Sequence, residues 1–223
     1  MTTVIPSKAE GSIKDMKNYE YIIASLPDIT TGWKFGEKTP EDYIEEIVSL
    51  CSEKDKALIE FLMSGYLEEN LTLEFYAKAL THTDAFIREY FRFDLNIRNA
   101  KVKYLNKALG RAADKDVLVF PEDADQAVLD AVAEEFEEAA DLETVLHAGD
   151  ILSRERGIDD LMWEKIDNLT TFNYFDIDAI LGFITKMNIV ARWYRLDEQT
   201  GREMFKKLVD EVRGTFKGVE YNG

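Results

Sequence analysis

The sequence predicts an all-α protein, a helical bundle or array, and three observations lead to this prediction. Apolar residues recur at helical spacing through nearly every segment that is long enough to judge. Residues typical of helix N-caps stand at the start of several of these segments. The chain also lacks the alternating rhythm of strands and helices, and it lacks an Asn-Gly hairpin signal between strand-like runs.

Composition restricts the partners that the protein can bind. The chain has 223 residues, of which 46% are hydrophobic, and this is enough for a sizeable core. Its net charge of −17 repels phosphate backbones and anionic lipids, so we expect neither nucleic acid binding nor direct membrane insertion. Without a segment typical of a signal peptide or a membrane span, we expect a cytoplasmic protein. The single cysteine, Cys51, suits a reducing compartment.

The first 26 residues carry the weakest structural signals. Residues 1 to 15 show no regular pattern, and we interpret them as a flexible leader or as a start assigned too early. YEYIIASL, at residues 19 to 26, fits either a short buried strand or a first helix. Pro27 and the Thr-Thr-Gly cluster behind it end either element.

Three N-cap signals predict three helices joined by short connections. Thr39 precedes a proline and two acids, the order that favours a helix start because proline presets φ and the acids face the positive end of the helix dipole. Ser52 opens a similar stretch, and Asn70-Leu71-Thr72 does so again before Phe75. Residues 84 to 109 then form the longest predicted helix of the first half, and Gly110 stands where a C-cap belongs.

The middle of the chain is strongly acidic. No Lys or Arg occurs between Lys115 and Arg154, yet apolar residues keep helical spacing, which predicts an amphipathic helix or helix pair with an acidic outer face. We expect further helices at about residues 159 to 167, 173 to 195 and 198 to 213, followed by a polar tail at 214 to 223. The 116–149 segment would then join two related halves of one domain, at about 36 to 115 and 150 to 213.

A repeat underlies the prediction of related halves. FDLNIRNAKVKYLN at residues 93 to 106 and FDIDAILGFITKMN at 175 to 188 align at an offset of 82 positions. If this is an internal duplication, both segments form equivalent long helices and Ala100 or Gly182 lets a neighbouring helix approach closely. Chance similarity between two amphipathic helices is the alternative. The proposed repeat core comprises Phe93, Leu95, Ala100, Val102 and Asn106, matched by Phe175, Ile177, Gly182, Ile184 and Asn188.

A basic stretch precedes the acidic segment. Helical spacing places Lys103, Lys107 and Arg111 on one side of the predicted long helix, and we expect these side chains to project into solvent. Such a stripe can dock an acidic partner, or residues 122 to 150 can fold back and neutralise it. The full basic set is Arg98, Lys101, Lys103, Lys107, Arg111 and Lys115, and the candidate partner-binding residues are Arg98, Lys103, Lys107 and Arg111.

Catalytic chemistry has little support in the sequence. No phosphate-binding loop, dinucleotide fingerprint or nucleophile elbow occurs, so we expect no cofactor and no catalytic residue. Glu143 and His147 stand four apart, as metal ligands on a helix do, but a second such pair is missing. We therefore favour a surface contact at this pair and expect no metal site.

The motifs resemble those of rotary ATPases. Helical units that open on an aromatic, acidic, aliphatic and Asn step resemble the C (or d) subunit of V/A-type ATPases, which is longer and has three helical lobes. MKNYEYIIASLPDI, FDLNIRN and WYRLDEQTGREMFKKLVDEV look like a bacterial family of formerly unknown function found among V-type ATP synthase subunits. This resemblance spans most of residues 16 to 213.

The resemblance implies a non-catalytic structural subunit of the central stalk, active in ion transport through its assembly. It would couple the rotor shaft to the membrane ring, from the cytoplasmic side and through protein partners alone. The resemblance carries over no catalytic residue and leaves open which surface meets which partner and whether protons or sodium ions are moved. A free-standing helical interaction module and a helical metal-dependent enzyme using Glu143 and His147 are the alternatives.

Overall fold

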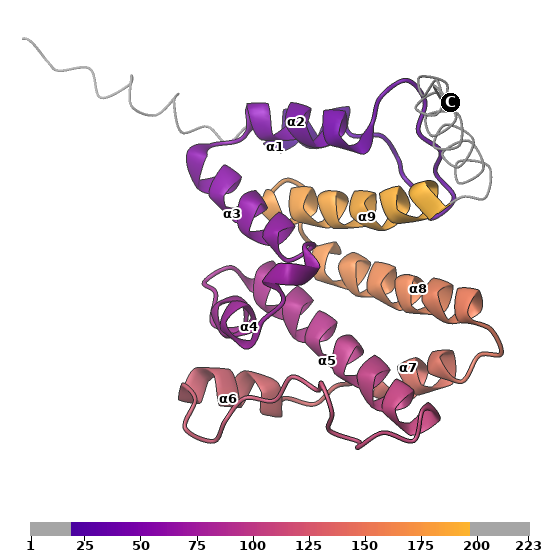
Figure 1. Cartoon of the computed structure of the whole chain (residues 1–223). Helices are drawn as coiled ribbons and strands as arrows, with labels where there is room; N and C mark the ends of the chain where they lie inside the picture. The colour runs from indigo at the N-terminus through magenta and orange to yellow at the C-terminus, as the bar shows by residue number, and fades with distance from the viewer. Residues whose placement is uncertain (1–18, 197–223) are drawn as a thin grey trace, which may run out of the picture.

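The computed structural model describes residues 19–196 (Figure 1), and within this range all regular secondary structure is helical. The all-α prediction is therefore confirmed. The predicted leader at residues 1 to 15, the helix at 198 to 213 and the tail at 214 to 223 lie outside the described residues. The α-helices are α1 (Tyr19–Ser25), α2 (Pro40–Leu50), α3 (Glu53–Ser64), α4 (Leu73–Leu80), α5 (Ala85–Ala108), α6 (Gln126–Ala133), α7 (Ala139–Leu146), α8 (Ile151–Thr170) and α9 (Ile177–Leu196), with one 3₁₀ turn, η1 (Glu68–Asn70).

The first element, which the sequence left undecided between strand and helix, is the helix α1. Its apolar residues do not alternate strictly, and Tyr19 and Ile22 lie three apart on one helical face. Both side chains are buried, and α1 packs against α9. Burial of one face against a neighbouring helix stabilises a seven-residue segment that would be marginal alone.

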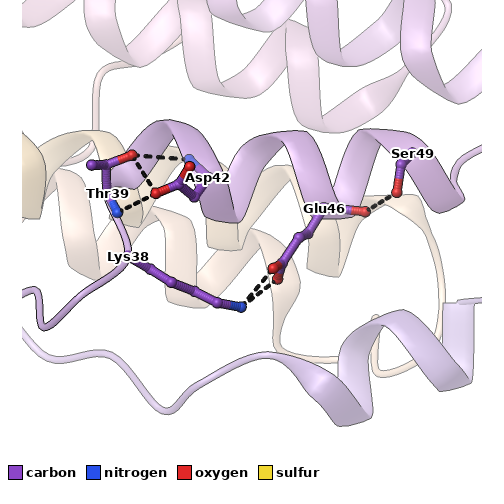
Figure 2. A network of polar contacts seen from close by, with 5 residues as sticks. All are labelled: Lys38, Thr39, Asp42, Glu46 and Ser49. Atoms are coloured by element: carbon purple, nitrogen blue, oxygen red, sulfur yellow. Dashed lines mark hydrogen bonds and ion pairs between the residues drawn. The ribbon is translucent and has the colours of Figure 1, made fainter.

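The three predicted helix starts are confirmed. Thr39 caps α2 by accepting a hydrogen bond from the Asp42 backbone N–H at 3.2 Å, while the Asp42 carboxylate accepts from the Thr39 N–H at 2.7 Å (Figure 2). These two reciprocal bonds form a capping box. Lys38 and Glu46 form an ion pair at 2.6 Å beside it. Ser52 and Thr72 likewise cap α3 and α4 through their hydroxyl oxygens.

The long helix of the first half is also confirmed. Asp84 caps α5 by accepting from the Ile87 N–H at 3.0 Å. The helix ends at Ala108 with Leu109 as its C-cap, and Gly110 follows with φ of 64°, a left-handed conformation that glycine adopts without steric cost. Local signals alone therefore place both ends of this 24-residue helix.

The acidic segment forms the helix pair α6 and α7, one of the two predicted forms. The helix expected at residues 159 to 167 is longer than predicted, because α8 begins at Ile151. Asp150 caps this earlier start by accepting from the Ser153 N–H at 2.8 Å. The exposed Ile151 and Leu152 in the first turn interrupt the apolar stripe that sequence periodicity follows.

The helices pack as a layered array. In Figure 1, α9 lies between the α1–α2 layer and α8, and α5 crosses beneath α8 toward α7. An aromatic cluster fills the region where α3, α4 and α5 meet. Phe75 stands edge-on to Phe91 with ring centroids 4.9 Å apart, and Phe61 stacks on Phe75 at 5.3 Å.

The internal duplication is not confirmed, because the two repeat segments differ at their most distinctive residues. Phe93 lies inside α5 and is 2% exposed, whereas Phe175 precedes α9 and is 61% exposed. Asp94 binds side chains in the middle of a helix, whereas Asp176 accepts from the Asp178 N–H at 3.0 Å at the start of α9. An aspartate suits either position, so the Phe-Asp step does not fix a register.

One part of the repeat hypothesis is confirmed at Gly182, where α8 and α9 approach closely. A Cβ atom on this glycine would lie 2.7 Å from the Thr170 Cγ2 atom and 3.3 Å from the Ile166 Cγ2 atom. An alanine at this crossing would therefore force the Thr170 side chain to shift. Ala100, its proposed counterpart, lies on α5 and is only partly buried.

Asp178, at the start of α9, has a side-chain carboxyl group with a raised pKa. Burial, together with the nearby Asp84 and Asp176, raises the pKa of Asp178 to about 6. Its pKa in the folded protein lies above the value of about 3.9 expected in the unfolded chain. The folded state thus favours the protonated form, and the stability that protonation contributes is lost as pH rises through about 6.

We therefore expect Asp178→Asn to raise the melting temperature at about pH 8 and to change it little at about pH 4. The asparagine keeps an acceptor for the side chain of Asn173, which binds Asp178 in the wild type. Thermal melts across this pH range measure the effect. Asp114→Asn, at an exposed aspartate, is the control. Equal effects of Asp178→Asn at both pH values would contradict the assignment.

Candidate functional site: a basic groove between α5 and α7

A groove of about 310 Å³ lies between α5 and α7. We call it the basic groove, because Lys103 and Lys107 line it from α5. Its floor is apolar, and Glu143 and His147 lie on the α7 side. The apolar lining residues are Ala100, Tyr104, Phe136, Ala139, Leu142 and Leu146.

Helix geometry assembles this groove from both walls. Lys103 and Lys107 are one turn apart on α5, and Leu142 and Leu146 are one turn apart on α7. The two helices pack against each other, so the lysines stand beside an apolar surface. An arrangement of this kind suits a segment that presents apolar and acidic side chains together.

The expected exposure of the basic stripe is confirmed. Lys103, Lys107 and Arg111 are exposed, and within residues 19–196 none of them forms an ion pair. The acidic segment does lie beside α5, but its paired carboxylates bind other cations. Glu134 pairs with Arg92, and Glu138 pairs with Lys165 at 2.8 Å. Internal neutralisation therefore leaves the lysines of the groove available.

The stripe is shorter than the sequence predicted. The helix turns at Gly110, so Arg111 and Lys115 lie beyond α5 and do not continue its face. The chain after the turn is held back on the helix end. The Asn106 side-chain amide donates to the Lys115 carbonyl at 2.7 Å, and the Arg111 N–H donates to the Asn106 carbonyl at 2.8 Å.

Arg98 and Lys101 form ion pairs with carboxylates that do not line the basic groove. Arg98 Nε donates to the Asp94 carboxylate at 2.7 Å, and the Tyr76 hydroxyl donates to the same oxygen at 2.5 Å. Lys101 pairs with Glu155 on α8 at 2.8 Å. Of the predicted partner-binding residues, the structure brings Lys103 and Lys107 to the basic groove and directs Arg98 elsewhere.

The Glu143 and His147 pair is a local contact at the C-terminal end of α7, where His147 is the C-cap. His147 Nδ1–H donates to the backbone carbonyl of Glu143 at 2.8 Å, and the ring stands edge-on to Tyr104. No group of three or more potential metal-binding side chains occurs in the described part of the chain.

A second exposed surface, not predicted from sequence, lies in the connection between α8 and α9. We call it the aromatic loop, defined by Phe172, Tyr174 and Phe175, which are 87%, 67% and 61% exposed. Asp176 at the start of α9 anchors its end. The run TTFNYFD, with three aromatics in four positions between two helices, is the sequence signal that could have indicated this surface.

The two surfaces stand at opposite ends of α8. Near its first end, a Cβ on Gly157 would lie 2.7 Å from Val145 of α7, which places the basic groove there. The aromatic loop follows its last residue, Thr170. The 13 positions of α8 from Gly157 to Thr170 span about 20 Å of helix, so the two surfaces are far enough apart to contact different molecules.

Within residues 19–196 the fold is a layered array of helices with two separate exposed surfaces, the basic groove and the aromatic loop. The family model described as Protein of unknown function (DUF2764) matches residues 66–215, and the chain belongs to this family. Neither the curated proteins nor the solved structures give a match. None of the helices between residues 19 and 196 has the length and apolar character needed to cross a membrane.

Proposed function

We propose that this protein is a non-catalytic structural subunit of a V/A-type rotary ATPase, coupling the central rotor shaft to the membrane ring. The observation that carries the proposal is the pair of exposed surfaces at opposite ends of α8, the basic groove and the aromatic loop. A coupling subunit must bind two neighbours at once, and it therefore needs two separate surfaces on a body that transmits force.

The chemistry of the two surfaces supports this role. The unpaired lysines of the basic groove suit an acidic, partly apolar segment, while the aromatic loop suits an apolar surface. The resemblance of FDLNIRN and WYRLDEQTGREMFKKLVDEV to a family found among V-type ATP synthase subunits supports rotor-shaft and membrane-ring subunits as the proposed partners. The protein would lie on the cytoplasmic side and reach the membrane only through these partners.

Affinity purification of the tagged protein from its native cells tests the proposal. We expect rotor-shaft and membrane-ring subunits to be recovered together with it. Recovery of an unrelated protein in their place would favour a free-standing interaction module, which the same basic groove would also serve. Stoichiometric metal in the purified protein would favour the enzyme alternative. Either result would overturn the rotary ATPase proposal.

Reversing the charge of the basic groove should weaken assembly while leaving the fold intact. We expect Lys103→Glu combined with Lys107→Glu to reduce partner recovery, and the wild-type interaction to weaken as salt is added, because exposed charges are screened beyond about 10 Å at 0.1 M ionic strength. Both side chains are exposed. Acidic residues near the end of α5 oppose the helix dipole by only about 0.3–1 kcal/mol each, so the melting temperature should fall slightly.

The matched control is Lys34→Glu combined with Lys54→Glu, an equal change of charge at two other exposed lysines. This variant should assemble like the wild type. If the groove variant also assembles like the wild type, the lysines are a solvated face and do not bind a partner. If it loses several kcal/mol of stability, the acidic segment neutralises the lysines internally.

A further inference from the structure

A larger cavity, of about 500 Å³, lies between α5, α8 and α9. We call it the polar cleft. It is distinct from the basic groove and combines apolar walls, including Ile158 and Met162, with the basic side chains Arg98 and Arg192. A volume of this size and a mixed lining are typical of sites for small molecules.

The tyrosine Tyr90 lines this cleft with an unusual hydroxyl group. The residue is 5% exposed, and its ring packs against Phe86 and Phe91. No hydrogen-bond partner for its hydroxyl occurs among residues 19–196. Two neighbouring tyrosines do have partners, since the partly buried Tyr66 donates to Thr185 at 3.0 Å and the buried Tyr76 donates to Asp94.

Although the side chain is largely buried, its hydroxyl oxygen is not one of the enclosed polar atoms that lack a partner, so it is reachable from the cleft, where water or a ligand can complete the bond. Burial raises the pKa of Tyr90 well above its usual value, so the hydroxyl keeps its proton and can donate. The donor therefore faces a cavity that can hold a ligand.

The charges around the cleft favour an anion. Its two carboxylates are already engaged: Asp94 accepts from Tyr76 and Arg98, and Asp159 accepts from Arg192 and Trp193. Each guanidinium carries five N–H donors, and both arginines keep donors beyond those in these pairs. The side chain of Asn188, which also lines the cleft, makes no hydrogen bond in the described part of the chain.

We propose that the polar cleft binds a small organic anion, a carboxylate or phosphate group attached to an apolar body. The anionic oxygens accept hydrogen bonds from Tyr90 and from the free donors of Arg98 and Arg192, and the apolar body lies against Ile158 and Met162. This site is independent of the rotary ATPase proposal, because it uses neither the basic groove nor the aromatic loop.

Thermal shift and calorimetric titration of the full chain with four probes test this site. Benzoate and phenyl phosphate carry the anionic group, whereas benzyl alcohol is neutral and benzylamine is cationic. We expect the anions at millimolar concentration to raise the melting temperature and the other two to leave it unchanged. The stronger of the two anions identifies carboxylate or phosphate as the preferred group. If neither anion binds, the cleft holds only water and the proposal is wrong.

The variant Tyr90→Phe separates a binding role from a structural one. Because the hydroxyl has no partner among the described residues, we expect the ligand-free variant to melt at or above the wild-type temperature. Its affinity for the better anion should fall by about tenfold, the effect of one hydrogen bond to a charged group. Tyr76→Phe is the control, and it should melt lower because its hydroxyl binds Asp94. Unchanged affinity in Tyr90→Phe, or a lower melting temperature without ligand, would overturn the assignment.

Discussion

Asp159→Ala should lower the free energy of unfolding by about 2 to 4 kcal/mol, because this carboxylate joins α8 to α9. Asp159 is 4% exposed and accepts hydrogen bonds from Arg192 and Trp193 on α9. The guanidinium carbon of Arg156 also lies 3.7 Å from the centroid of the Trp193 ring. Removing the carboxylate leaves the indole N–H without its acceptor and the arginine without its partner. In a chain of this size the melting temperature should fall by about 10 °C.

Two further variants identify the source of this effect. Asp160→Ala changes the neighbouring, exposed aspartate and should alter stability by about 0.5 kcal/mol or less. Asp159→Asn should cost less than Asp159→Ala, because the amide oxygen can still accept from Trp193. Burial raises the pKa of Asp159 despite its partners, which means that the ionised form is incompletely compensated. If Asp159→Ala melts like Asp160→Ala in thermal and urea unfolding, the carboxylate does not hold these helices together.

Gly65→Ala should destabilise the protein by about 1 to 3 kcal/mol, the usual cost of overpacking a core. A Cβ atom at this position would lie 2.4 Å from the Phe91 ring and 2.8 Å from the Phe75 ring. These rings pack edge-on to each other, so neither can move without disturbing its neighbour. The backbone of Gly65 has φ of −75°, which alanine adopts readily, so the loss comes from the overlap and not from backbone strain.

Gly149→Ala provides the matched control, because a Cβ there would meet no atom within 4 Å. Alanine restricts the unfolded chain, so this control should be neutral or slightly stabilising. Urea unfolding of both variants measures the difference. A Gly65→Ala variant as stable as the control would mean that the aromatic cluster yields without cost.

Sequence-based prediction was most accurate where the signal is local. Thr39, Ser52, Thr72 and Asp84 begin helices as expected, since a cap bonds to backbone groups only two or three residues away. Sequence-based prediction was least accurate for the proposed repeat, because that hypothesis placed Phe175 in the core. Phe93 and Phe175 share a sequence context but not a position in their helices, and burial depends on that position.

The candidate sites also contain features that the sequence predicted and features that it did not. Periodicity predicted that Lys103 and Lys107 share an exposed face, because that relation depends on one helix alone. It could not predict the apolar floor beside them, which α7 supplies. Periodicity also extended the stripe to Arg111. This extension is wrong, because the left-handed turn at Gly110 changes the direction of the chain before Arg111.

The sequence by itself determined the helical class, the helix starts named above and the exposed lysines of the basic groove, because each follows from interactions within about one helical turn. Tertiary structure alone decided the polar cleft, the aromatic loop and the carboxylate that joins α8 to α9. Tyr66 and Thr185 illustrate the difference, since their hydroxyls meet across 119 positions of the chain. Contacts over such separations depend on how whole helices pack, and that packing is set by the combined burial of many side chains, which no local pattern records.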